Sequence, residues 1–452
     1  GDQSLTVLEQ DPMRLTEIPG ITEKKAQEMA ESFQRQSGIR RLIEFLTMYH
    51  LPAQLAVRLY RAYGELAQEA LQDDPYLLTD PYYSADFSQV DAFAIALGVS
   101  ADDERRVEAG ILFELSYNLG AGHTFIPQDK LRAATCALLE LDGETIDAGF
   151  TRLQEQERMM CSELAGITAC YLPELYEAET YVCRRILSMA EAELPEPKRL
   201  DALLKTIEDR QEIDYAPEQL AAIRAAAAHQ LLIVTGGPGT GKTTVMAGIL
   251  QLFDELKLKT QLAEASTIHR LLEAQFDEQT GAMAFYHDED APLSCDAMIV
   301  DETSMVDLPL MASLLKALKP GCRLLLVGDP DQLPPVGPGN VFSDLIRSGM
   351  VQTVRLTQIF RQAQKSLIVM NAHAVNQGEL PRLTATDRDF FFLRRRDPAA
   401  AVRTIQELCQ TRLPKNMGIA PADIQVLSGR EKREKTRRFF LPDRRSGNAN
   451  PE

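Results

Sequence analysis

The stretch that most constrains this chain is Leu231 to Leu250, "LLIVTGGPGTGKTTVMAGIL". An apolar run of strand type meets a glycine-rich turn, and a helix-like run follows Lys-Thr-Thr. Gly236 to Thr243 fits the pattern G-x-x-x-x-G-K-[ST] in full. In such a loop the backbone N–H groups surround the phosphates of a nucleotide. The chain is therefore expected to hold a nucleoside triphosphate between a strand and a helix.

The residue types in this loop predict separate tasks. Lys242 is expected to reach the β- and γ-phosphates, and the Thr243 hydroxyl is expected to bind Mg²⁺. We predict ATP as the nucleotide and Mg²⁺ as its metal. The expected nucleotide contacts are Gly236, Gly237, Pro238, Gly239, Thr240, Gly241, Lys242, Thr243 and Thr244.

A second acidic motif, "AMIVDETSM", follows the loop in the sequence. Its apolar strand delivers Asp301 and Glu302 at the carboxyl end, where ligands of α/β sheets bind. Asp301 is expected to hold Mg²⁺ through water. Glu302 is expected to orient and deprotonate the attacking water. Alone, Asp-Glu after an apolar run is equally typical of a solvated strand end, and the complete phosphate loop upstream favours the catalytic interpretation.

Three further residues are candidates for the same site. Gln332 lies in the proline-bracketed loop of "LLLVGDPDQLPPVGPGNVF", where an amide can bond both the γ-phosphate and the attacking water. Gln219 lies one turn into a helix opened by Pro217, and its amide can pair with the adenine edge. Arg361 in "LTQIFRQ" is a candidate γ-phosphate clamp. In isolation, a surface glutamine or a surface salt bridge would be the commoner interpretation of these residues.

The order of helix-like and strand-like segments along the chain predicts several domains. Residues 1–195 are predicted to be a helical region, 196–215 a linker with a helix, 216–395 a P-loop ATPase domain with a parallel sheet, 396–428 the start of a second α/β domain, and 429–452 a disordered basic tail. The predicted strands are Leu231–Val234, Thr260–Ala263, Ala297–Val300, Leu324–Val327, Thr353–Leu356 and Ile424–Leu427. A helix is predicted from Ala399 to Leu413.

The helical region repeats one local pattern three times. Two helical segments flank a turn in each copy, with glycines at Gly20, Gly64 and Gly98. A helix-turn-helix hairpin with a glycine turn offers backbone N–H groups to a DNA phosphate without reading bases. A plain αα-hairpin remains the alternative for each copy.

Composition excludes other classes. The seven cysteines form no CxxC pair, which favours reduced thiols in a cytoplasmic protein. No apolar stretch of ~18 residues predicts a membrane span, and the first residues do not resemble a secretory signal. The net charge of −18 counts against a broad basic face that coats nucleic acid, but not against a narrow channel with a few phosphate contacts.

Taken in order, these motifs carry a family resemblance. Gln219, "GGPGTGKT", "STIHRLL", "VDETSMVD", "GDPDQLPPVGPGNVF" and "LTQIFRQ" resemble the first RecA-like motor domain of a superfamily 1 DNA helicase of the RecD-like type. The helical region resembles the helix-hairpin-helix extension of the longer members. The resemblance covers roughly residues 10–428.

The resemblance implies an ATP-driven 5′→3′ motor on single-stranded DNA, or on DNA with a 5′ single-stranded end, active in DNA repair and recombination. It places Thr267 and His269 near the DNA path. Two departures stand against full activity: the segment like "APTGRAAKR" before "STIHRLL" is missing, and so are the later motifs of the second motor domain. We therefore expect ATP affinity with weak or no unwinding. The resemblance leaves protein partners open.

Two rival functions remain at this stage. The chain is alternatively a DNA-binding module in which the nucleotide site acts only as a switch. A P-loop kinase is the second rival, and the Gln332 loop and the lack of an evident acceptor-binding lid count against it.

Overall fold

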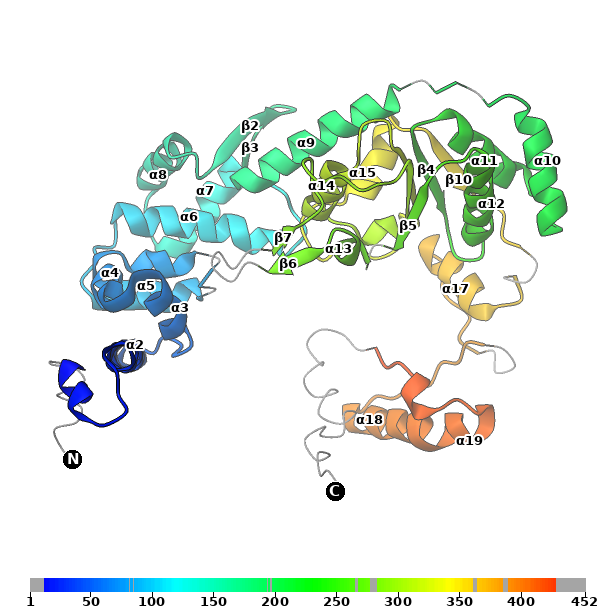
Figure 1. Cartoon of the computed structure of the whole chain (residues 1–452). Coiled ribbons are helices and arrows are strands. Elements are labelled where there is room, and N and C mark those ends of the chain that lie inside the picture. The colour runs from blue at the N-terminus through cyan, green and yellow to red at the C-terminus, as the bar shows by residue number, and fades with distance from the viewer. Residues whose placement is uncertain are drawn as a thin grey trace. The chain divides into compact units, whose positions relative to one another are not determined.

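A computed structural model describes residues 12–80, 82–83, 85–192, 194–195, 197–264, 267–276, 283–360, 364–384 and 389–427. The chain divides into two compact units, Gly1–Ala363 and Gln364–Glu452 (Figure 1). The boundary between them falls inside the predicted span 216–395. Among the described residues, no helix is long and apolar enough to cross a membrane.

The first unit begins with a helical region, as predicted. Its helices are the 3-10 helix η1 (Pro12–Glu17), α2 (Glu23–Met48), α3 (Leu55–Tyr63), α4 (Ala67–Asp73), α5 (Phe87–Ala96), α6 (Glu104–Leu119), α7 (Gln128–Leu139), α8 (Gly143–Glu155) and α9 (Pro173–Ala190). Short 3-10 turns lie at Gly64–Leu66 (η2) and Pro75–Thr79 (η3). The sequence analysis did not anticipate the small antiparallel sheet of β1 (Ile126–Pro127), β2 (Met160–Leu164) and β3 (Ile167–Tyr171), in the order β1-β3-β2.

The three glycine turns are present at their expected places. Gly20 separates η1 from α2, Gly64 ends α3, and Gly98 lies between α5 and α6. Gly20 and Gly98 both have φ of 93°, a backbone conformation that side chains with a Cβ rarely adopt. The side chain of Thr22 caps α2 by accepting a hydrogen bond from the Lys25 amide at 3.3 Å, so the helix begins directly after it at Glu23.

The core of the helical region contains a buried ion pair. Arg106 on α6 donates two hydrogen bonds, of 2.8 and 3.0 Å, to the carboxylate of Asp91 on α5. The Arg106 side chain is only 7% exposed. A buried charge of this kind is tolerated because its partner and its hydrogen bonds replace the lost water.

A five-stranded parallel sheet forms the second part of this unit. Its strands are β4 (Leu231–Gly236), β5 (Thr260–Glu264), β8 (Ala297–Asp301), β9 (Arg323–Gly328) and β10 (Thr353–Leu356), in the order β10-β4-β9-β8-β5. All adjacent pairs are parallel. The five predicted strands are confirmed to within two residues, because buried parallel strands have apolar runs with little alternation.

Helices cover both faces of the sheet. The alternate residues Leu232 and Val234 of β4 face a cluster with α10 (Leu200–Gln211), α11 (Pro217–Ala228) and α12 (Lys242–Glu255). Leu231 and Ile233 face the opposite cluster, which contains α14 (Leu308–Ala317) and residues of α13 (Ile268–Leu271) and α15 (Val341–Ser348). A two-stranded ribbon, β6 (Ala274–Phe276) and β7 (Met283–Phe285), follows α13.

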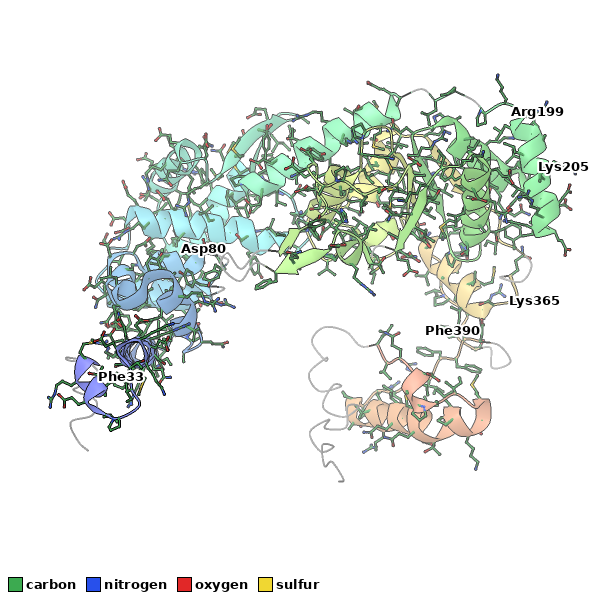
Figure 2. The ribbon with its side chains drawn as sticks, viewed as in Figure 1. Phe33, Asp80, Arg199, Lys205, Lys365 and Phe390 are labelled. Atoms are coloured by element: carbon green, nitrogen blue, oxygen red, sulfur yellow. The ribbon has the colours of Figure 1, made fainter. Side chains whose placement is uncertain are left out.

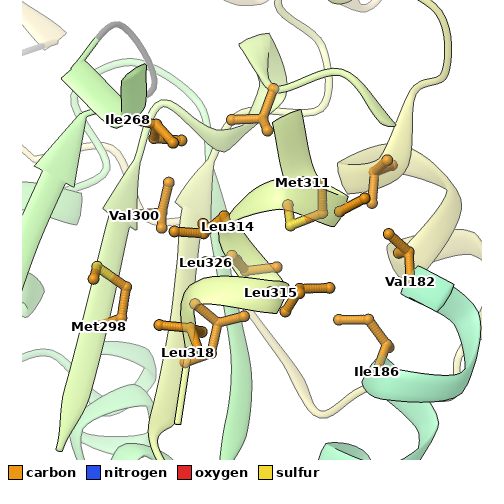
Figure 3. Packing of buried hydrophobic residues seen from close by; sticks show 14 of the residues in the cluster. Val182, Ile186, Ile268, Met298, Val300, Met311, Leu314, Leu315, Leu318 and Leu326 are labelled. Atoms are coloured by element: carbon orange, nitrogen blue, oxygen red, sulfur yellow. The ribbon is translucent and has the colours of Figure 1, made fainter. Parts of the chain in front are cut away.

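Helix α9 of the helical region completes this opposite cluster. Val182 and Ile186 of α9 pack beside Met311 and Leu315 of α14 (Figure 3). The Arg185 guanidinium also donates to the Leu318 carbonyl at 3.1 Å. Helix α10, which lies in the predicted linker, instead packs on α12 and keeps Lys205 on its exposed face (Figure 2). Helix α9 therefore shares a hydrophobic cluster with the sheet, while the rest of the helical region has a core of its own.

The second unit is described over residues 364–384 and 389–427. It contains α17 (Leu367–Asn376), α18 (Pro398–Glu407), a π-helical turn η6 (Leu408–Arg412), α19 (Leu413–Met417) and a 3-10 turn η7 (Pro421–Asp423). The predicted helix Ala399–Leu413 is present. The predicted strand Ile424–Leu427 is wrong for this structure: a strand needs a neighbour for its backbone hydrogen bonds, and the described part of this unit contains none. The predicted tail, 429–452, lies outside the described residues.

Candidate nucleotide-binding site

The glycine-rich loop joins the end of β4 to the start of α12. Gly239 and Gly241 have φ of 77° and 83°, so the loop depends on glycine at both positions. The Lys242 ammonium donates to the carbonyls of Gly236 and Gly237 at 2.5 and 3.2 Å. The lysine therefore lies folded over the loop, with a partly exposed cation at the place where phosphates would enter. Thr243 is exposed at the first turn of α12.

The strand order brings the acidic motif to the same edge. β8 is separated from β4 by β9 alone, and the carboxyl ends of parallel strands meet at one edge of the sheet. Asp301 ends β8, and its carboxylate accepts the Glu302 amide at 2.8 Å. Glu302 has φ of 53°, which turns the chain sharply after the strand.

Glu302 carries an unpaired acceptor. Its Oε2 atom is buried and has no hydrogen-bond partner within the described part of the chain. A buried carboxylate oxygen without a partner is costly. An incoming donor, such as a water molecule, would satisfy it.

The Gln332 loop touches the turn that follows Glu302. The Ser304 hydroxyl donates to Oε1 of Gln332 at 3.4 Å, and Gln332 is otherwise exposed. Beyond it, the Gly339 amide donates to the Gly122 carbonyl at 3.0 Å. The loop thus connects the acidic turn with the helical region.

Gln219 lies against the phosphate loop. It is 3% exposed, and its Oε1 atom accepts the Ala216 amide at 3.0 Å. A Cβ added at Gly241 would lie 2.4 Å from Nε2 of Gln219 and 2.9 Å from Cε2 of Phe360. The structure therefore places Gln219 in a packed position beside the loop; recognition of adenine remains a prediction.

The segment after β10 contributes residues that the sequence analysis did not single out. The Phe360 amide donates to the Gly239 carbonyl at 3.2 Å. The Glu218 carboxylate accepts the Thr357 amide at 2.6 Å and the Thr357 hydroxyl at 2.5 Å, and these bonds lower the pKa of Glu218. Glu218 is next to Gln219 in "YAPEQLAAI" and Thr357 opens "TQIF", but nothing in either motif alone pairs them.

The remaining predicted residues lie elsewhere or are not described. Thr267 precedes α13, and its hydroxyl donates to the Glu264 carbonyl at 2.9 Å, at the end of β5. His269 is exposed on α13, with its ring 5.8 Å from that of Phe285. Arg361 lies outside the described residues.

Two family models match this chain. One is the helix-hairpin-helix domain of the ATP-dependent RecD2 DNA helicase, over residues 35–125, and the other is an AAA domain, over residues 214–392. They cover the region of the second and third glycine hairpins and the sheet that carries the phosphate loop. Their order along the chain is the order that the motifs predict.

Relatives match over a longer span. The ATP-dependent RecD2 DNA helicase of Deinococcus radiodurans is 32% identical over 411 residues, which cover 84% of this chain and 55% of that protein. The RecBCD enzyme subunit RecD of Mycolicibacterium smegmatis is 33% identical over 219 residues, 39% of this chain and 37% of that protein. The chain spans about half, or less, of the length of these relatives.

A solved structure also aligns with part of the chain. The Pif1 helicase of Candida albicans gives a TM-score of 0.31 at 18% identity, over 51% of this chain and 62% of that one. A score this low supports no detailed comparison of the two folds.

Proposed function

This chain belongs to the RecD-like family of superfamily 1 DNA helicases, and we propose that it couples ATP hydrolysis to 5′→3′ movement on single-stranded DNA. The observation that carries the proposal is the meeting of three motifs at one sheet edge: the phosphate loop, the Asp301–Glu302 turn and the Gln332 loop. The direction of movement rests on the family alone.

The residues present fit a nucleoside triphosphate with Mg²⁺. The loop keeps its shape because Gly236 and Gly241 lack a Cβ, which would collide with Thr240 and Gln219. Lys242 would exchange its two carbonyl acceptors for phosphate oxygens. Thr243 and Asp301 would hold the metal, which neutralises phosphate charge when it is bound. No cluster of three or more acidic, histidine or cysteine side chains able to hold a metal occurs in the described residues, so phosphates and water would supply the other ligands.

Glu302 and Gln332 are the proposed hydrolytic pair. The unpartnered Oε2 of Glu302 is available to accept a proton from the attacking water. Gln332 would orient that water. Its hydrogen bond from Ser304 would link its position to that of the acidic turn. The loop then continues to the Gly122–Gly339 contact, which gives the helical region a physical connection to the site.

The DNA contacts are proposed for two places. The glycine turns at Gly20, Gly64 and Gly98 are proposed as phosphate contacts on their sequence pattern alone. The Gly64 and Gly98 amides donate to the Tyr60 and Ile95 carbonyls in this structure, and a DNA phosphate would have to replace those acceptors. Thr267 and the exposed His269 lie after β5, at the carboxyl edge of the sheet. Arg361 is proposed as the γ-phosphate clamp on its motif alone.

The decisive measurement is ATP hydrolysis with and without oligo-dT, in wild type and Lys242→Ala. Stimulation by DNA that disappears in the variant supports the proposal. ATP binding without DNA-stimulated turnover would contradict coupling in this chain. A strand-displacement assay on a 5′-tailed duplex then tests direction, with a 3′-tailed duplex as the control.

A second candidate function is a DNA-binding module with a nucleotide switch. It rests on the match of residues 35–125 to a helix-hairpin-helix domain model. It predicts intact DNA binding whose affinity changes with ATP, together with turnover that DNA does not stimulate.

A further inference from the structure

Two cysteines face each other across the small antiparallel sheet. Cys161 on β2 is paired in register with Cys170 on β3. Their Sγ atoms are 3.3 Å apart, with both thiols in the reduced state. A disulfide bond would shorten this separation to about 2.05 Å, so a small rotation of the side chains is enough to close it.

The backbone at this pair suits such a bond. The turn between the strands is Ala165–Gly166, with φ of 50° and 81°, the two-residue turn that closes on a hydrogen-bonded pair. Counting outward from Leu164 and Ile167, the pairs alternate in type, so Cys161 and Cys170 fall at a pair without mutual backbone hydrogen bonds. Pairs of that type have the closer side chains.

The third strand agrees with this count. Pro127 of β1 is opposite Ala169, and proline has no N–H to donate. By the same alternation, the backbone N–H and C=O of Ala169 point toward β2. The missing N–H of Pro127 therefore costs no hydrogen bond to Ala169. The neighbouring residue, Cys170, then bonds toward β1 and keeps its side chain free to meet Cys161.

The two thiols differ in access and acidity. Cys161 is half-buried, whereas Cys170 is fully buried. The Cys170 thiol and, secondarily, the Gln154 amide at 2.8 Å stabilise the Cys161 thiolate and lower the pKa of Cys161 to about 7. The same contact, with burial, raises the pKa of Cys170. A nucleophilic thiolate is thus reachable from solvent, with a resolving thiol directly behind it.

We propose that Cys161 and Cys170 are a reversible oxidation site, at which a hydroperoxide converts the two thiols into an intramolecular disulfide. The Cys161 thiolate attacks a peroxide oxygen and becomes a sulfenic acid, and the other oxygen leaves as an alcohol, or as water from hydrogen peroxide. The Cys170 thiol then displaces water from the sulfenic sulfur. The sulfurs lose two electrons to the peroxide, and a dithiol reverses the change.

A second close pair shows why distance alone does not make such a site. Cys295 and Cys322 have Sγ atoms 3.9 Å apart, but their exposures are 0% and 1%. Neither can meet a peroxide while the sheet is folded. This pair is a built-in control within the same chain, and exposed Cys183 is the control for ordinary access.

The test treats the full chain with hydrogen peroxide, alkylates the remaining thiols and maps peptides by mass spectrometry without reduction. The expected product is a Cys161–Cys170 linked peptide that a dithiol removes, with Cys295 and Cys322 still alkylated after unfolding. Its rate of formation should rise through about pH 7 and level off above it, because the thiolate is the reacting form.

Two variants make the mechanism testable. In Cys170→Ser, Cys161 should stop at the sulfenic acid, which dimedone traps. In Cys161→Ser, Cys170 should stay reduced because it is buried. The proposal is overturned if wild-type Cys161 and Cys183 oxidise at the same rate, if Cys161 links only between chains, or if the Cys295–Cys322 pair oxidises first. Wild-type mapping decides the question even if a variant folds poorly.

Discussion

At the scale of single residues, the candidate site is defined by groups that lack something. Lys242 has only loop carbonyls as acceptors, and one oxygen of Glu302 has no partner in the described structure. Gly236 and Gly241 lack the Cβ atoms that would collide with Thr240 and Gln219. The unpaired Glu302 oxygen costs free energy in the protein alone, and the attacking water of a bound triphosphate would satisfy it.

The role of Glu302 predicts a separation of binding from turnover. In Glu302→Gln, ATP hydrolysis should fall by about 10²–10⁴-fold, the usual contribution of a general base. Affinity for a fluorescent ATP analogue should stay near that of wild type, since the proposed role of this carboxylate is in turnover and not in holding phosphates. Glu28→Gln, on the exposed face of α2, is the control. Equal loss of affinity and turnover would argue against a base.

The glycines predict a contrast between crowding and conformation. Gly241→Ala would place a Cβ 2.4 Å from Gln219 and add backbone strain at φ of 83°. Gly98→Ala has comparable strain at φ of 93° but meets nothing within 4 Å. Both should lose about 1–2 kcal/mol of stability from the backbone alone. Only Gly241→Ala should also abolish nucleotide binding, as measured by calorimetric titration; equal binding by both variants would contradict the described packing.

At the scale of elements, the segment after β10 is held to the start of α11 by Glu218. The Glu218 carboxylate accepts hydrogen bonds from the Thr357 amide and hydroxyl, and this contact keeps Phe360 beside Gly239. This arrangement places the beginning of "LTQIFRQ" directly at the phosphate loop. Secondary structure alone would leave residues 357–360 as an unremarked coil.

The Glu218 contact has a predictable pH dependence. Its pKa is lowered by hydrogen bonds from Thr357, below the ordinary value of 4.5. The folded state therefore binds this proton less readily than the unfolded state, so the stabilisation is present above about pH 4.5 and is lost as the pH falls further. Thermal unfolding should separate wild type from Glu218→Gln at pH 7 and bring them together near pH 3. Asp214→Asn, which removes a carboxylate four residues away, is the control variant.

Helix α9 joins the helical region to the sheet by burial. Ile186 is 2% exposed within the cluster that contains α14. Ile186→Ala should cost about 2–5 kcal/mol, the range for large-to-small changes in a core. Ile95→Ala is the matched control, because Ile95 is 51% exposed. Denaturant unfolding measures both, and a single transition shifted as a whole would show that packing of α9 couples the unfolding of both regions; a small effect at Ile186 would refute it.

At the scale of the whole molecule, the net negative charge disfavours the binding of nucleic acid. A net charge of −18 gives no general attraction for phosphates. DNA affinity, if the proposed function holds, must arise from a few local contacts. The helical region contacts the sheet part of this unit through α9 and through the Gly122–Gly339 hydrogen bond.

Local contacts predict a moderate salt slope. The logarithm of oligo-dT affinity should fall linearly with the logarithm of salt concentration, by about 0.7 for each phosphate neutralised on a single strand. Fluorescence anisotropy between low and physiological salt measures it. Binding to a phosphate-free base analogue is the control. A flat response would exclude a DNA channel that grips phosphates.

The sequence by itself determined the parts whose signal is local. The phosphate loop, the five parallel strands and the three glycine turns follow from short patterns of glycine and apolar residues, and the structure contains them at their expected places. The prediction of a strand at 424–427 was wrong. A strand forms only when a neighbouring strand pairs with it, and the residues of the segment itself do not encode that neighbour.

Only the tertiary structure decided which distant residues meet. Glu218 and Thr357 are 139 residues apart, Arg185 and Leu318 are 133 apart, and Cys161 and Cys170 pair through a turn whose register no composition specifies. Such contacts depend on how whole elements pack, and packing is a property of complementary surfaces and not of the short stretches that form each element. The motifs thus indicate the chemistry, and the tertiary fold determines which residues lie beside them.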